Sequence, residues 1–228
     1  MKCHVFVDFD GTISPLDTTD VVLERFADPL WRDIEDDWKC GRIGSRECMA
    51  RQIDLVRASP EQLDAFIASV ETDPGFPGFV HQCRELGHCV TVVSDGLDRT
   101  VSTVLQRAGL DLPFCANRLE WIGGDRWRLS FPHAKSGCLS LAGTCKCQFA
   151  ASERRAARIV IGDGRSDFCL AGSADLVLTK GVLGAHCLSH GLPHIMFNEF
   201  AEASKVLANW VAKRRNGLTT PAAQRGEQ

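Results

Sequence analysis

Two aspartates stand directly behind a short apolar run near the start of the chain, and this arrangement limits the possible folds more than any other feature. The run Cys3–Val7 predicts a buried strand, and it leads into Asp8-Phe9-Asp10-Gly11-Thr12. Side chains of an extended segment alternate between faces, so Asp8 and Asp10 share one face while Phe9 points to the opposite, buried side. Neighbouring carboxylates repel each other unless one is protonated or a cation lies between them. Because hard oxygen ligands suit Mg²⁺, the pair predicts a magnesium site and an acid/base partner.

The rest of the chain alternates between helix and strand patterns. Helical periodicity covers residues 17 to 70, and within it Ser59-Pro60-Glu61-Gln62 predicts a helix start with a serine cap, proline at the first helical position and a capping box. Strand patterns resume after this region and are again separated by helical ones. The predicted strands are 89–93, 158–161 and 175–178, with a hairpin at 118–131, and the predicted helices are 79–86, 98–108 and 198–213.

Strands separated by helices imply a parallel sheet with right-handed crossovers. We therefore expect an α/β fold with a Rossmann-like parallel sheet as its core, formed by residues 1–14 and 79–215. A helical cap, residues 15–78, is expected as an insertion between the first and second strands, and residues 216–228 are expected to form a loose polar tail. The 228 residues suffice for one domain and such an insertion.

Polar groups follow three of the predicted strands. Besides the aspartates of the first strand, Ser94-Asp95-Gly96 follows the second, and Gly162 to Asp167 follows the strand at 158–161. In open α/β sheets, ligands bind beyond the carboxyl ends of the strands. The Ser94 hydroxyl and the Gly96 backbone N–H can approach an anion at a helix start. Asp163 and Asp167 add two carboxylates, and together these groups predict a site for a phosphate ester bound over Mg²⁺.

Carboxylates alone would repel a phosphate dianion, so a metal, a lysine and backbone donors must supply positive potential. Lys146 is the candidate lysine because it lies just ahead of a predicted helix and of the strand that leads to Asp163; Lys135 is its competitor. An aspartate can attack phosphorus to form an aspartyl-phosphate, which divides hydrolysis into two easier steps. Asp10 can then protonate the leaving oxygen and later take a proton from water.

With these motifs in this order, the chain resembles the haloacid dehalogenase superfamily of phosphatases over nearly its whole length. The resemblance implies that Asp8 is the nucleophile and that Asp10 is the acid/base. It also implies that the Asp8 carboxylate, the Asp10 backbone carbonyl and Asp163 hold Mg²⁺, and that Asp167 supports the metal's waters or orients Lys146. The phosphate-binding residues implied in this way are Ser94, Asp95, Gly96 and Lys146.

The helical insertion resembles the cap of the phosphoserine-phosphatase-like branch, in which Asp17 and Arg51 correspond to residues that contact substrate. Phe131-Pro132-His133 and Gly143-Thr144-Cys145 are most similar to phosphatases of methionine salvage, which act on 2-hydroxy-3-keto-5-methylthiopentenyl-1-phosphate. Phosphoserine or phosphocholine and phosphoethanolamine are the alternative substrates. Asp95 stands where phosphoserine phosphatases usually have glycine, and Asp17 is shorter than their glutamate, which argues against phosphoserine. A non-catalytic regulatory protein on the same fold is a remote alternative, because no chemical group of the site is missing.

The composition of the chain limits the kinds of partner that the protein is expected to bind. The net charge of -3 and pI near 6.2 leave no overall basic footprint for nucleic acid, and the insertion itself is acidic, which favours a small substrate. No apolar stretch approaches the length of a membrane span, and the cysteines are scattered and odd in number, which favours reduced thiols. We therefore expect a cytoplasmic protein.

A zinc site would use Cys138, Cys145, Cys147 and His133. However, only Cys145 and Cys147 are close together in the sequence. They are separated by one residue, Lys146, whereas the cysteines of structural zinc sites are usually separated by two.

Overall fold

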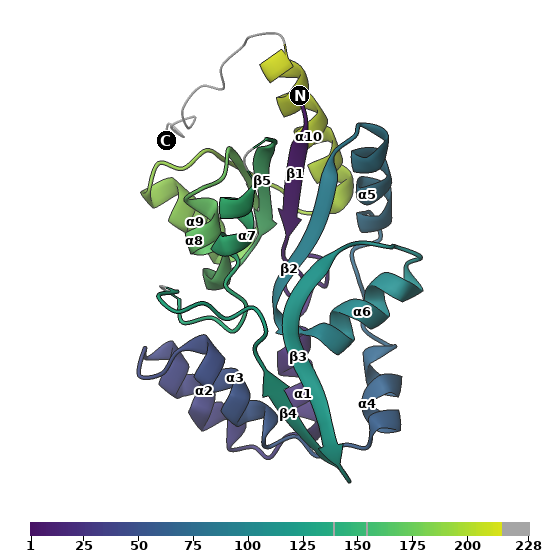
Figure 1. Cartoon of the computed structure of the whole chain (residues 1–228), viewed down its shortest axis with the longest axis vertical. Coiled ribbons are helices and arrows are strands. Elements are labelled where there is room, and N and C mark those ends of the chain that lie inside the picture. Colours follow the sequence, from purple (N-terminus) through teal and green to yellow (C-terminus); the bar gives the residue numbers. More distant parts are fainter. Residues whose placement is uncertain (139, 154, 216–228) are drawn as a thin grey trace.

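The computed structural model describes residues 1–138, 140–153 and 155–215 (Figure 1), so the predicted tail 216–228 lies outside the described residues. The elements are β1 (Cys3–Val7), α1 (Thr18–Phe26), α2 (Trp31–Lys39), α3 (Ser45–Ile53), α4 (Pro60–Ile67), α5 (Phe76–Glu85), β2 (Cys89–Leu97), α6 (Asp98–Arg107), β3 (Phe114–Gly123), β4 (Arg126–Ser130), α7 (Cys147–Ser152), β5 (Ala157–Gly162), the 3-10 turn η1 (Arg165–Asp167), α8 (Phe168–Ala171), β6 (Leu176–Thr179), α9 (Gly181–Ser189), β7 (His194–Met196) and α10 (Phe200–Arg215).

A seven-stranded sheet in the order β4-β3-β2-β1-β5-β6-β7 forms the centre of the molecule. All neighbouring strands are parallel except β3 and β4, which pair as an antiparallel hairpin with Leu119 opposite Leu129 and Trp121 opposite Trp127. The predicted α/β class, parallel sheet and hairpin are therefore confirmed. Because β1 lies between β2 and β5, the ends of these three strands are side by side, and their polar groups meet at one edge. β2 continues to Leu97, so Ser94, Asp95 and Gly96 lie in its last residues and not after it as predicted.

Helices cover both faces of the sheet. One face packs against α5, α6 and α10 through a core that includes Phe79 and Phe200, and the other packs against α7, α8 and α9 through residues such as Leu170 and Leu183. Figure 1 shows α5 and α10 on one side of the sheet and α7 to α9 on the other. Burial on both faces explains why β1 and β5 are continuous apolar runs rather than alternating ones.

A separate hydrophobic cluster lies between the helical insertion and the β3–β4 hairpin. It contains Leu23 from α1, Leu63 from α4 and Trp127 from β4, and all three side chains are almost completely buried. The Trp127 Nε1–H donates to the Ala58 carbonyl oxygen at 2.9 Å, which fixes the hairpin to the insertion. Thus the far part of the hairpin, although it continues the sheet in Figure 1, shares a core with α1, α3 and α4.

The structure adds elements that the sequence pattern does not indicate. β7 has only three residues, too few to show a period, and α9 carries Gly181 and Gly184 within an almost uniformly apolar segment. α5 begins at Phe76, three residues before the predicted start, because proline at position 77 suits the first turn of a helix. Within the part of the chain that the structure describes, no helix combines the length and apolar character needed to cross a membrane.

Candidate active site

The end of β1 fixes the first aspartate. The Asp8 backbone N–H donates to the Ile161 carbonyl oxygen of β5 at 2.8 Å, and its side chain is only 6% exposed. Phe9 is fully buried, as the alternation of side chains predicts. Gly11 has a φ of +70°, and a Cβ there would lie 2.3 Å from the Asp163 carboxylate. Only glycine lets the chain turn at this point while the carboxylates behind β1 and β5 come together.

Lys146 lies at the centre of the site. Its Nζ is 2.7 Å from Asp8 Oδ2 and 2.8 Å from Asp167 Oδ1, and the lysine side chain is 1% exposed. Burial alone would lower the pKa of Lys146, but the charges of Asp167 and Asp8 outweigh it and raise that pKa above its usual value. The lysine is therefore a buried ammonium between two carboxylates. Lys135, the competing candidate, is exposed at the surface.

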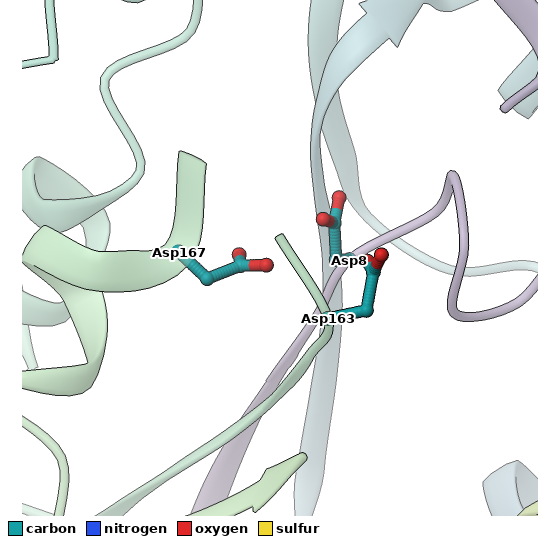
Figure 2. A group of neighbouring side chains, drawn as sticks. All are labelled: Asp8, Asp163 and Asp167. Atoms are coloured by element: carbon teal, nitrogen blue, oxygen red, sulfur yellow. The ribbon is translucent and has the colours of Figure 1, made fainter. Parts of the chain in front are cut away.

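Three aspartates converge at this edge of the sheet. Asp8, Asp163 and Asp167 each offer a carboxylate oxygen, and these oxygens all lie within 4.8 Å of one another. Figure 2 shows the three side chains reaching one space from the segments behind β1 and β5 and from η1. Burial, and then the charge of Asp167, raise the pKa of Asp163 to about 6. The cluster thus holds more negative charge than Lys146 neutralises, and its oxygen donors fit a hard divalent cation.

The cysteines do not form a comparable group. Within residues 1–138, 140–153 and 155–215, the three aspartates are the only set of three or more His, Cys, Asp or Glu residues with such closely grouped ligand atoms. Cys145 and Cys147 lie with their sulfur atoms 3.3 Å apart, but neither Cys138 nor His133 completes a set. The described residues therefore offer a hard oxygen site and no four-ligand zinc site.

Asp10 occupies a different position from the other carboxylates. Its Oδ1 accepts hydrogen bonds from the Thr18 backbone N–H at 2.7 Å and from the Thr18 hydroxyl at 2.6 Å. Burial, followed by the charge of Asp17, raises the pKa of Asp10 to about 7, although the bonds from Thr18 oppose this. A carboxyl with a pKa near neutrality can both donate and accept a proton, which is what acid/base catalysis requires.

The end of β2 faces Asp10. Ser94 is fully buried and its hydroxyl accepts a hydrogen bond from the Gly96 backbone N–H at 2.8 Å. A Cβ at Gly96 would lie 2.3 Å from Asp10 Oδ2, so glycine is the residue that allows this close approach. Asp95 also lines the cavity between the strand ends and the helical insertion, and its carboxylate accepts hydrogen bonds from Ser45, Asn117 and Thr144.

A cavity of about 350 Å³ lies between the strand ends and the helical insertion. Its floor includes Asp8, Asp10 and Asp163, and its roof includes Trp38 from α2 and Met49 from α3. The remainder of the lining includes the acidic residues Asp17, Asp20, Glu35 and Asp95, and Arg165, which is exposed, is the one basic residue among the described lining residues. The cavity therefore joins the aspartate cluster to a roof supplied by the insertion.

Of the two residues predicted to contact substrate, Asp17 lines the cavity and Arg51 does not. Asp17 lines the cavity, but its carboxylate also caps α1 by accepting hydrogen bonds from the backbone N–H groups of Thr19 and Asp20. Arg51 is not among the lining residues; its guanidinium is paired with Glu47 at 3.5 Å and with Asp37 at 3.9 Å. Arg51 therefore lies outside the cavity, with its half-exposed guanidinium next to two carboxylates.

Two threonines that hold the aspartates were not singled out from the sequence. Thr18 binds Asp10, and Thr12 donates from its hydroxyl to Asp163 Oδ1 at 3.2 Å. Thr12 is the last residue of the pentapeptide that follows β1, and Thr18 directly follows the aspartate that caps α1. Both threonines therefore lie in motifs that the sequence already indicates. The partner of each threonine, however, is set by the packing of β1, β5 and α1.

The parallel sheet, the aspartate cluster at its carboxyl edge and the buried lysine define an α/β protein with an acidic site whose oxygen donors could hold a divalent cation. The chain belongs to the haloacid dehalogenase-like hydrolase family, whose sequence model matches residues 5–172. This match includes β1, the insertion, the hairpin, Lys146 and the three aspartates, so the family resemblance predicted from the motifs is confirmed.

Relatives of known name match most of the chain. It is 32% identical over 210 residues to a 2-hydroxy-3-keto-5-methylthiopentenyl-1-phosphate phosphatase from Exiguobacterium sp. (strain ATCC BAA-1283 / AT1b), with 90% of this chain and 96% of the relative covered. It is 33% identical over 214 residues to the protein of the same name from Geobacillus kaustophilus (strain HTA426), covering 89% and 94%. Among solved structures, a phospho-aspartyl intermediate analogue of phosphoserine phosphatase has a TM-score of 0.68 and 19% identity, covering 91% of this chain and 98% of that one. That likeness supports the fold.

Proposed function

We propose that the protein is a Mg²⁺-dependent phosphomonoester hydrolase that works through an aspartyl-phosphate on Asp8. The observation that carries this proposal is the buried Lys146 ammonium, which lies within 2.8 Å of both Asp8 and Asp167 beside a cluster of carboxylate oxygens. A buried lysine in this position can hold a phosphate oxygen, and its charge lowers the pKa of Asp8 against the increase that burial causes. The names of the relatives agree with this reaction class.

Each residue has a separate task in the proposed reaction. Asp8 attacks phosphorus, and the bond to the leaving oxygen breaks while Asp10 gives that oxygen a proton. In the second step Asp10 takes a proton from water, which attacks the phosphoryl group and frees Asp8. The Ser94 hydroxyl and Lys146 bind the phosphate oxygens, and the Gly96 backbone N–H, which donates to the Ser94 hydroxyl oxygen, orients that hydroxyl towards them. Asp8, Asp163, the Asp10 carbonyl oxygen and Asp167 would hold Mg²⁺, which when bound supplies positive charge next to the phosphoryl oxygens.

The helices α1 to α4 are proposed to form the cap over this site. All four share a core with the hairpin, and α1, α2 and α3 line the cavity, so they are placed to exclude water and to choose the substrate. The substrate named for both relatives, 2-hydroxy-3-keto-5-methylthiopentenyl-1-phosphate, is the first candidate. Trp38, Cys48 and Met49 give the roof an apolar part that suits a thioether group.

A phosphate-release screen tests this proposal. The purified protein with Mg²⁺ is expected to hydrolyse the methylthiopentenyl phosphate with a kcat/KM at least about tenfold above that for phosphoserine, because Arg51 is not among the cavity-lining residues and the lining adds several carboxylates that would repel the serine carboxylate. Phosphocholine and phosphoethanolamine complete the panel, because the acidic lining suits a cationic group. Absence of phosphate release from every monoester would refute the proposed reaction, and a preference for phosphoserine would refute the substrate assignment.

Removal of the divalent cation is expected to abolish activity. The three grouped carboxylates have one lysine ammonium between them, and a phosphate dianion cannot approach such a cluster unaided. Exhaustive chelation should reduce phosphate release at least about a hundredfold, the order of an electrostatic stabiliser, and added Mg²⁺ should restore it. Full activity after chelation, with metal analysis showing no bound cation, would contradict the metal assignment.

A further inference from the structure

The Asp95 side chain links three segments that are far apart in the sequence. Its Oδ2 accepts a hydrogen bond from the Ser45 hydroxyl at 2.7 Å. Its Oδ1 accepts one from the Thr144 backbone N–H at 2.8 Å and one from the Asn117 side-chain amide at 3.1 Å. Ser45 is the first residue of α3, Asn117 lies on β3, and Thr144 stands two residues before Lys146. One carboxylate therefore joins the helical insertion, the sheet and the segment that carries the lysine.

Two of the partners of Asp95, Asn117 and Thr144, are buried and also bind each other. Asn117 and Thr144 are both fully buried. The Asn117 amide also donates to the Asp95 backbone carbonyl oxygen at 2.6 Å, and its own carbonyl oxygen accepts from the Thr144 hydroxyl at 3.1 Å. A buried polar network whose members satisfy one another holds its parts in one arrangement. Thr144 is thereby held from both its backbone and its side chain.

A second contact joins the same two segments. The Arg46 backbone N–H of α3 donates to the Leu141 carbonyl oxygen at 3.0 Å, and a Cβ at Gly44 would lie 2.5 Å from the Leu141 Cβ. Leu141 has a φ of +49°, the one non-glycine residue with a positive φ in the part of the chain that the structure describes. A leucine keeps this backbone conformation only where its surroundings hold it there. The segment before Lys146 is thus shaped against the start of α3.

We propose that Asp95 is a positioning residue that couples the docking of the insertion to the placement of Lys146. With α3 docked, Ser45 and Arg46 hold Asp95 and Leu141, and the Thr144 amide is fixed two residues from the lysine. If α3 moves away, both bonds from the insertion are lost and the segment 141–146 is less restrained, so Lys146 is held firmly only beneath a closed roof. The catalytic consequence rests on the proposed function, whereas the structural coupling does not.

Hydrogen exchange of the Thr144 amide tests the coupling without any substrate. Ser45→Ala removes the bond from the insertion to Asp95, and Asp95→Ala removes the acceptor itself. Asp95→Ala removes the charged acceptor of this amide and Ser45→Ala leaves that acceptor less restrained, so the exchange rate of the amide should rise about tenfold in either variant. Asp95→Asn keeps an acceptor for the Thr144 N–H and should restore most of the protection. Ser69→Ala, whose exposed hydroxyl binds only the Phe66 carbonyl oxygen of its own segment, is the matched control and should leave exchange unchanged.

The possible results distinguish coupling between α3 and Lys146 from a purely local role of Ser45 or Asp95. Unchanged Thr144 exchange in folded Ser45→Ala would overturn the proposal, because the insertion would then not restrain the lysine segment. In turnover assays, Ser45→Ala should lower kcat about tenfold, and the double variant with Asp95→Ala should be no worse than Asp95→Ala alone, since both act through one link. Additive losses, or a rise in KM with kcat unchanged, would also overturn it. If the wild-type protein had no phosphatase activity, the proposed function would be refuted, but the hydrogen-exchange experiment would still test the coupling.

Discussion

Replacement of Asp8 by asparagine is expected to abolish turnover while leaving the protein folded. An amide has almost the same shape as the carboxylate but cannot attack phosphorus, so the first step of the proposed reaction is lost. Removal of a nucleophile lowers kcat by about three to six orders of magnitude in well-studied hydrolases. Folding should survive because Lys146 still has Asp167 at 2.8 Å and because residue 8 keeps its backbone bond to Ile161.

Phosphate release under steady-state conditions measures this effect, and denaturant unfolding checks the fold. A rapid acid quench of the wild-type protein with substrate should show one added phosphoryl group on the peptide that contains Asp8, and the variant should show none. Asp111→Asn, a change at an exposed aspartate outside the cavity lining, is the matched control. Normal activity of Asp8→Asn would remove Asp8 as the nucleophile.

The strand ends and their carboxylates are predictable from the sequence because they follow from local rules. Asp8 directly follows an apolar strand, and Asp163 follows another, so the parallel sheet places them side by side without further information. Phe9 is fully buried for the same reason, since alternation sends it to the opposite face. The order of the motifs also identifies the family, which the sequence model matches over residues 5–172.

Contacts between the insertion and the sheet are not predictable in this way. Ser45, Asn117 and Thr144 meet at Asp95 only because α3, β3 and the segment before Lys146 pack together, and no periodicity relates them. Arg51 illustrates the opposite case. Its place in the sequence corresponds to a substrate-binding arginine, but neighbouring acidic residues on its own and the preceding helix hold it outside the cavity. Local sequence therefore predicts the reaction better than the substrate.

Lys146→Ala is expected to lower both phosphate affinity and the stability of the fold. The variant leaves Asp8 and Asp167 buried and facing each other without their shared cation, and breaking a buried ion pair in this way costs about 3–5 kcal/mol of unfolding free energy. Urea unfolding in metal-free buffer measures the stability, and inhibition by inorganic phosphate measures the affinity. Lys135→Ala, at an exposed lysine, should change the unfolding free energy by less than about 0.5 kcal/mol. The reverse result would transfer the role to Lys135.

The pH dependence of this variant provides an independent check on the same charges. Burial and the charge of Asp167 raise the pKa of Asp8, and Lys146 opposes this increase, so loss of the lysine should raise the pKa of Asp8 further. A carboxyl whose pKa is higher in the folded than in the unfolded protein destabilises the fold at a pH above its unfolded pKa, and this penalty disappears as the group is protonated. The stability deficit of Lys146→Ala relative to wild type should therefore shrink as the pH falls from about 7 towards the ordinary aspartate pKa of about 4. A deficit that is the same at both pH values would mean that lost packing around the lysine stem, rather than an unbalanced carboxylate pair, accounts for the instability.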